Sequence, residues 1–225
     1  MFDWFKSGKE NAELEADTAL PGDRLTITAQ SGLLSGTHVA SNLGWRKVEA
    51  LSVGDKVLTF DNSMQTITDI RRETLFIGER GHAHPTTLPV HVPKGALYNR
   101  CDLWLMPEQG LLIESDAASD ALGDPFAIVS AQSLTGFRGI CREAPSDQLE
   151  ITTLSFEQDE VVYAEGGLLA YCPQPRDFLM DELTGQHGIY EVLDRNQGRY
   201  LVECLVAEDC ARGITYDPEE VALLA

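Results

Sequence analysis

The sequence predicts a mainly β protein with a helical C-terminal segment, and three observations support this fold class. Apolar and β-branched residues alternate with a period of two through the middle of the chain, as half-buried strands require. Glycine and Asx turns separate these stretches, which is typical of many short antiparallel strands. After Pro175 the apolar period changes to three and four residues, which favours helix.

These patterns divide the chain into three parts. Residues 1–24 form an acidic N-terminal lead that ends at Pro21 and Gly22, where we expect a short helix followed by a turn. Residues 25–175 form the predicted all-β domain. Residues 176–225 form an acidic helical C-terminal segment.

The β domain is expected to contain a strand at each period-two stretch. One helical turn interrupts it, because Ser115 can cap a helix that begins at Asp116 and Gly123 can end that helix. The expected strands cover residues 25–28, 37–40, 56–60, 66–70 and 149–154, and the expected turns lie at 42–44, 54–55 and 61–62.

The C-terminal segment shows helical spacing and a strong negative charge. Its apolar residues recur at three and four residue steps in the stretches 178–183, 190–193 and 200–205. From Arg176 onward there are 11 acidic and 4 basic residues. We expect the apolar face to pack on the β domain or on another chain, and we predict that the acidic face binds a basic protein partner.

The overall composition excludes several functional classes. The 225 residues carry 36 acidic and 17 basic side chains, a formal charge of -19, and 43% of them are apolar, so a disordered chain is not expected. This charge disfavours nucleic acid and anionic membrane surfaces as partners. No apolar stretch approaches the length that spans a bilayer, and the N-terminus lacks a signal-peptide pattern, so a cytoplasmic location is predicted.

The five cysteines indicate reduced thiols rather than a framework. Their number is odd and they form no CxxC pair, so neither disulfides nor a zinc knuckle is suggested. His82 and His84 could share one face of a strand, but no third ligand is evident nearby, and His91 lies between prolines in an extended stretch. Asp116, Asp120 and Asp124 recur at every fourth residue, which does not fit a calcium loop. We therefore predict no metal site and no cofactor.

Four blocks of the middle segment resemble the Hint domain, the hedgehog/intein autoprocessing fold, and in particular its bacterial Hint_2 type. The resemblance rests on the order and spacing of the blocks over residues 32–166, and it implies a horseshoe of short antiparallel strands built from two pseudo-symmetric halves. The blocks cover residues 32–41, 44–59, 102–112 and 160–166.

The resemblance also implies a chemistry, whose essential positions are altered in this chain. In the family a cysteine attacks the preceding carbonyl, and a Thr-x-x-His block assists by donating a proton to the leaving nitrogen. Alignment on Gly36-Thr37 places Gly32 at the nucleophile position and Gln109 at the histidine position. Glutamine donates a hydrogen bond but transfers no proton at neutral pH. Asp159 takes a common histidine position, and no terminal His-Asn pair is found.

Three functions follow as competing hypotheses. The first is a non-catalytic, degenerate Hint module used for binding or assembly. The second is residual self-cleavage by an N-to-O acyl shift at the Gln30-Ser31 bond, with Ser31 as nucleophile and Gln109 in the assisting position. The third is an unrelated cysteine hydrolase that uses Cys101 or Cys172 with a histidine that the sequence does not locate.

Overall fold

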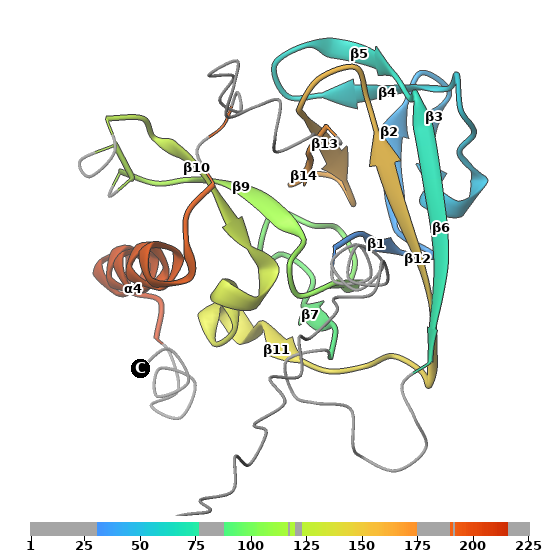
Figure 1. Cartoon of the computed structure of the whole chain (residues 1–225). Helices are drawn as coiled ribbons and strands as arrows, with labels where there is room; N and C mark the ends of the chain where they lie inside the picture. The colour runs from blue at the N-terminus through green and yellow to red at the C-terminus, as the bar shows by residue number, and fades with distance from the viewer. Residues whose placement is uncertain are drawn as a thin grey trace, which may run out of the picture.

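Two antiparallel sheets make up most of the computed structural model (Figure 1). It describes residues 31–76, 88–116, 118, 119, 123–174, 190 and 192–215. Its strands are β1 Leu33–Leu34, β2 His38–Ser41, β3 Gly44–Lys47, β4 Lys56–Thr59, β5 Ser63–Thr66, β6 Asp69–Phe76, β7 Val90–Val92, β8 Leu103–Leu105, β9 Gly110–Glu114, β10 Phe126–Ser130, β11 Cys141–Arg142, β12 Gln148–Ser155, β13 Glu160–Ala164 and β14 Leu168–Cys172. The helices are the 3-10 turns η1 Val48–Ala50, η3 Ala131–Leu134 and η4 Phe137–Gly139, and the α-helix α4 Arg195–Ala211.

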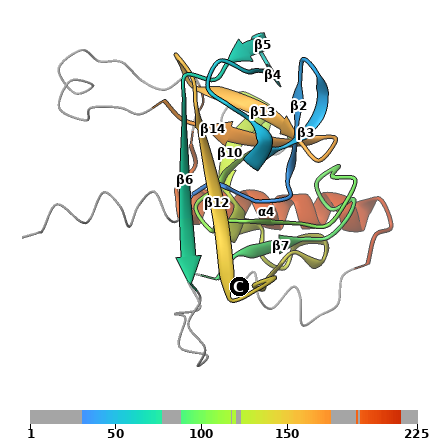
Figure 2. The same ribbon diagram turned by 90° about the vertical axis from the view of Figure 1, so that its right-hand side faces the viewer.

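The first sheet has six strands in the order β11-β7-β8-β1-β12-β6. Its longest pairing joins β6 to β12 from Asp69↔Ser155 to Phe76↔Gln148, and Figure 2 shows the two strands side by side. The two-residue strand β1 lies between β8 and β12. The segment that begins at Leu33 is therefore held in the interior of this sheet.

The second sheet has eight strands, in the order β10-β9-β14-β13-β2-β4-β5 with β3 paired to β2. The expected turns at 42–44 and 61–62 are present, because each joins two paired strands. In the first, Gly44 pairs with Ser41 and adopts a φ of 93°, which favours glycine. In the second, Ser63 pairs with Thr59.

The single strand expected at 66–70 is wrong. β5 ends at Thr66 in the second sheet, and β6 begins at Asp69 in the first. Between them Ile67 is fully buried, and the amide of Thr68 donates to the carbonyl of Ser155. The period of two continues through this corner because the chain stays extended and half-buried while it passes from one sheet to the other.

The predicted fold class is confirmed: the protein is mainly β, with antiparallel sheets and a C-terminal helix. The expected strands at 37–40, 56–60 and 149–154 correspond to β2, β4 and β12. The expected turn of helix is also present, since Asp116, Ala118 and Ser119 are helical and the Ser119 amide donates to the Ser115 carbonyl. The acidic lead, the expected strand at 25–28 and Asp120 lie outside the described residues.

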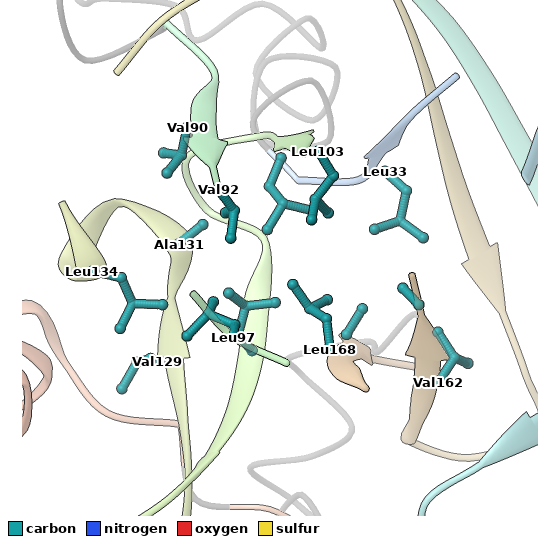
Figure 3. Close-up of a cluster of buried hydrophobic side chains, with 14 of the residues drawn as sticks. Leu33, Val90, Val92, Leu97, Leu103, Val129, Ala131, Leu134, Val162 and Leu168 are labelled. Carbon is teal, nitrogen blue, oxygen red and sulfur yellow. The ribbon is translucent and has the colours of Figure 1, made fainter. Parts of the chain in front are cut away.

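A large apolar core lies between the sheets and the helix (Figure 3). The first sheet contributes Leu33 and Leu103, the second contributes Val162 and Leu168, and α4 contributes Val202. Burial of each such side chain stabilises the fold by about 1.5–3 kcal/mol. The helix therefore shares the core of the β domain, which is the first of the two packing arrangements expected for its apolar face.

Helix α4 is fixed at both of its ends. At the start, Asp194 caps the backbone amides of Asn196 and Gln197, and Gln197 completes the capping box. Near the end, the buried Asp209 accepts two hydrogen bonds of 2.6 Å from the guanidinium of Arg138. No helix of the described residues has the length and apolar character that a membrane span needs.

The stretch before α4 is not the helix that its spacing predicts. Val192 forms a parallel bridge with Ile128 of β10, and the Leu193 amide donates to the carbonyl of Ile128 at 2.9 Å. The apolar residues of 190–193 recur at helical steps, but the backbone at 192–193 adds to a sheet edge. Here pairing with β10 prevails over local spacing.

Candidate functional site

Gly32 lies immediately before β1, in a backbone conformation and a space that exclude a side chain. Its φ is 137°, which L-residues rarely adopt. A Cβ built there would lie 2.6 Å from Cγ2 of Ile151 and 3.2 Å from the carbonyl oxygen of Thr152. Both neighbours belong to β12, the partner strand of β1. The space beside Gly32 is therefore filled by the sheet.

Gln109 is buried at the start of β9, with its amide group held by backbone carbonyls. Its Nε2 donates to the carbonyl oxygens of Tyr171 at 2.8 Å and Gly110 at 2.9 Å. A flipped amide would place an oxygen against both carbonyls, so the hydrogen bonds fix its orientation. Oε1 consequently points toward Ser31. Gln109 thus offers Ser31 an acceptor, and its N–H groups are bound elsewhere.

Ser31 and Gln109, which the sequence analysis paired, do lie together. The Ser31 hydroxyl donates to Oε1 of Gln109 at 3.5 Å, which is a weak hydrogen bond. The carbonyl of Ser31 accepts from Oγ1 of Thr153, also at 3.5 Å. A serine needs a base to become a nucleophile, and an amide oxygen is too weakly basic for that role. Gln30, on the other side of the proposed scissile bond, lies outside the described residues.

A cavity of about 300 Å³ opens beside Ser31. One wall comes from the β domain, with Glu108, Ile128 and Tyr171, and another comes from the chain that leads into α4, with Leu193 and Arg195. This second wall follows the β domain by some twenty residues in sequence. The C-terminal segment therefore helps to enclose the region around Ser31.

Asp159 and Glu160 are both buried near the end of the aligned region. Asp159, which the resemblance places at a common histidine position, accepts a hydrogen bond of 2.9 Å from the backbone amide of Gln174. The carboxylate of Glu160 accepts from the side-chain amides of Asn62 and Gln158, each at 3.1 Å. Through these hydrogen bonds both carboxyl groups hold neighbouring loops against the start of β13.

The two cysteines proposed as hydrolase nucleophiles differ in environment. Burial, aided by the nearby Glu160 carboxylate, raises the pKa of Cys172 to about 12, so its thiol stays protonated. Cys101 is exposed. Of the three histidines weighed as metal ligands or bases, His91 lies in β7, as its extended sequence predicts. His82 and His84 lie outside the described residues.

Two partners of this site carried no signal in the sequence. Tyr171 acts through its backbone carbonyl, which any residue could supply, and Thr153 contacts Ser31 across a strand pairing 122 positions distant. Pairing of β1 with β12 brings Thr153 to Ser31, and pairing of β14 with β9 brings the Tyr171 carbonyl to Gln109.

The mainly β fold of antiparallel sheets is the one expected of the Hint class that the block order indicates. A family model described as a Hint domain, Hint_2, matches residues 31–170, and the chain belongs to this family. The matched range ends before α4, so the helix and the chain that leads into it extend beyond it.

Solved structures of inteins and intein-like domains are also similar to this chain. A bacterial intein-like domain from Clostridium thermocellum is 12% identical, with a TM-score of 0.45, over 63% of this chain and 98% of that one. The gp41-1 intein is 12% identical, with a TM-score of 0.40, over 61% of this chain and 97% of its own. No curated protein sequence matches the chain.

Proposed function

We propose that this protein is a non-catalytic Hint domain that serves as a binding or assembly module. The observation that carries the proposal is the filled space at Gly32, where the family places its nucleophile. A missing thiol alone would leave an empty site of the right shape. Here the Cγ2 of Ile151 occupies that space, 2.6 Å from where a Cβ would lie.

The environment of Gln109 supports the same proposal. A group that assists bond cleavage must direct a proton or a free N–H toward the reacting atoms. Gln109 carries no transferable proton, and both carbonyls that bind its Nε2 belong to the fold. Catalytic groups that act as a unit lose several orders of magnitude in rate when one is removed. In this chain both central positions have changed.

Residual cleavage at Gln30-Ser31 is the second candidate, because Ser31 and Gln109 are in contact. It would require the Ser31 hydroxyl to attack the carbonyl of Gln30, forming an ester and releasing the amine. Gln109 directs an acceptor of low basicity at that hydroxyl, which does not favour the attack. The contact therefore favours a structural use of Ser31.

The intact mass of the purified 225-residue chain tests the proposal, before and after incubation with hydroxylamine, which cleaves an ester. A non-catalytic module gives one species with the mass of the whole chain under both conditions. Cleavage at Gln30-Ser31 contradicts the proposal. A Ser31→Ala variant then identifies the nucleophile, since cleavage that persists in this variant excludes the acyl shift.

The predicted basic partner depends on acidic residues other than those fixed in α4. The carboxylate of Asp194 is used by the helix cap and that of Asp209 by Arg138. Glu208 accepts from the Ser115 hydroxyl and lies 3.8 Å from Arg212, so Glu203 is the helix carboxylate with no such contact among those of the described residues. Most of the acidic residues of the C-terminal segment lie outside the described residues. Binding of a basic partner and a cytoplasmic location both stay predictions.

A further inference from the structure

A row of three side chains crosses the edge of the six-stranded sheet, and none of them belongs to the candidate site. Cys141 of β11 is the register partner of His91 in β7, and His91 is in turn the partner of Trp104 in β8. Directly opposed residues of antiparallel strands place their side chains on the same face. The indole of Trp104 stacks on the imidazole of His91 with ring centroids 4.8 Å apart, which fixes the plane of the imidazole.

Glu143 adds a carboxylate to this row. It follows Cys141 by two residues, so in extended chain its side chain returns to the same face. Its backbone amide donates to the carbonyl of Pro89 at 3.0 Å, which continues the pairing between the edge strand β11 and its neighbour β7. Strand pairing rather than chance contact therefore places the Glu143 carboxylate beside the imidazole.

Three donor atoms of different chemistry meet at one point. Nδ1 of His91 lies 3.9 Å from Sγ of Cys141 and 3.8 Å from a carboxylate oxygen of Glu143. All three ligand atoms lie within 4.8 Å of one another. A tetrahedral zinc ion with bonds of about 2.1 Å to nitrogen and 2.3 Å to sulfur would hold those two atoms about 3.6 Å apart. The observed distance between Nδ1 and Sγ exceeds this value by a few tenths of an ångström, and the exposed Glu143 side chain also has to move closer when the ion binds.

The other imidazole nitrogen of His91 faces a carboxylate. Nε2 of His91 is buried and has no hydrogen-bond partner among the described residues, and the nearest carboxylate oxygen, from Asp102, lies 3.8 Å away. The second oxygen of Asp102 accepts from the Lys94 amide at 2.7 Å, which anchors this carboxylate. A metal-bound histidine commonly donates its free N–H to such a carboxylate, an arrangement that fixes the tautomer and raises the basicity of the ligand.

We propose that His91, Cys141 and Glu143 form a zinc site, with Asp102 as the hydrogen-bond acceptor that orients His91. One thiolate, one imidazole and one carboxylate are a donor set suited to Zn²⁺. The fourth position of a tetrahedral site is left to water. The ion reaches the site from solvent, because the Glu143 side chain is 62% exposed.

The two key ligands lie 50 positions apart in the sequence, on strands of two and three residues, so no local motif in the sequence predicts the site.

Titration of the whole chain with Zn²⁺ against a chromogenic chelator tests the proposal, with Co²⁺ as the spectroscopic probe. Wild type should bind one ion at this site, and its cobalt form should show a thiolate-to-metal charge-transfer band. Cys141→Ser should remove that band. Asp102→Asn should leave the band and weaken zinc binding about 10–100-fold. Cys101→Ser is the matched control, because Cys101 is exposed and should leave both readouts unchanged.

Two results overturn the proposal. The first is a wild-type chain that takes up no zinc in the competition. The second is zinc binding and a charge-transfer band that persist in both Cys141→Ser and His91→Gln, which places any site elsewhere. Glu143→Gln changes an exposed side chain and so keeps the fold, which the far-ultraviolet circular dichroism of each variant checks. A drop in affinity for this variant supports the site independently of any folding defect in the others.

Discussion

The crowding at Gly32 can be measured by two glycine-to-alanine substitutions four residues apart. Gly32 and Gly36 both have positive φ angles, 137° and 96°. A Cβ at Gly36 meets nothing within 4 Å, whereas one at Gly32 meets Ile151 at 2.6 Å and Thr152 at 3.2 Å. Both variants place an L-residue at positive φ, and only Gly32→Ala adds the contact with β12. Gly36→Ala is therefore a control for an alanine at positive φ without that contact.

The expected magnitudes follow from these two contributions. An L-residue at positive φ costs about 1–2 kcal/mol, part of which the lower entropy of the unfolded alanine chain offsets by about 0.4–1 kcal/mol. Gly36→Ala should therefore lower the free energy of unfolding by about 1 kcal/mol. An added group in a packed interior costs about 1–3 kcal/mol more, so Gly32→Ala should lower it by about 2–4 kcal/mol.

Urea unfolding, followed by tryptophan fluorescence, gives both free energies under the same conditions. A difference of at least about 1 kcal/mol between the variants supports the view that β12 fills the nucleophile position. Equal losses for Gly32→Ala and Gly36→Ala would refute the reasoning. They would mean that the sheet yields readily and that a side chain could be accommodated at position 32.

Two further predictions concern the helix anchor and a buried thiol. Arg138→Met should destabilise the protein by about 3–5 kcal/mol in urea unfolding, because it removes both guanidinium hydrogen bonds from the buried Asp209 carboxylate. The double variant Arg138→Met/Asp209→Leu should recover much of this loss, and no recovery would contradict the explanation. Cys172 keeps its proton in the folded state up to about pH 12, whereas the unfolded chain releases it above pH 9.0. The free energy of unfolding is therefore unaffected by this group below pH 9 and falls as the pH rises toward 12. The fall should be smaller in Cys172→Val. Identical pH profiles of the wild type and this variant would contradict the prediction.

Alternation of apolar and polar residues predicted strands such as β12, whose expected range of 149–154 lies within the observed Gln148–Ser155. Thr152 and Leu154 are nevertheless buried on the face that Gln148 and Glu150 expose, which the pattern does not show. The same rule failed at 66–70, because alternation describes burial along an extended chain and is silent on which sheet the chain joins. A change of sheet at Ile67 leaves no mark in the pattern.

The attachment of α4 was only half predictable. Its apolar spacing predicts a face that packs, and Leu201, Val202 and Leu205 are indeed buried. Asp209 belongs to the same buried face, although an aspartate in an acidic segment is expected to be solvated. Its partner Arg138 lies 71 positions away, in a turn where it adopts a φ of 47°. Only the tertiary fold brings the two charges together.

The sequence predicted which residues belong to the candidate site, and the structure shows what surrounds each of them. Alignment paired Gly32 with the nucleophile position and Gln109 with the proton donor, but it could not say whether the surrounding space remained. Side chains from β12 and a carbonyl from β14 decide that question, and both depend on register between strands that are distant in sequence.

Hydrogen-bonding capacity differs between the candidate site and the edge of the six-stranded sheet. At the candidate site Nε2 of Gln109 is bound by two carbonyls, and Ile151 fills the space beside Gly32. At the edge of the six-stranded sheet the opposite holds. His91 is fixed in orientation by Trp104, yet its buried Nε2 has no hydrogen-bond partner among the described residues, and Nδ1 lies near a thiol and a carboxylate at distances too long for strong bonds. An ion bound at Nδ1 would fix the proton of the imidazole on Nε2, the nitrogen that faces the Asp102 carboxylate. The residues with unused binding capacity therefore lie at the β7–β11 edge, and a zinc ion is the ligand that their chemistry fits.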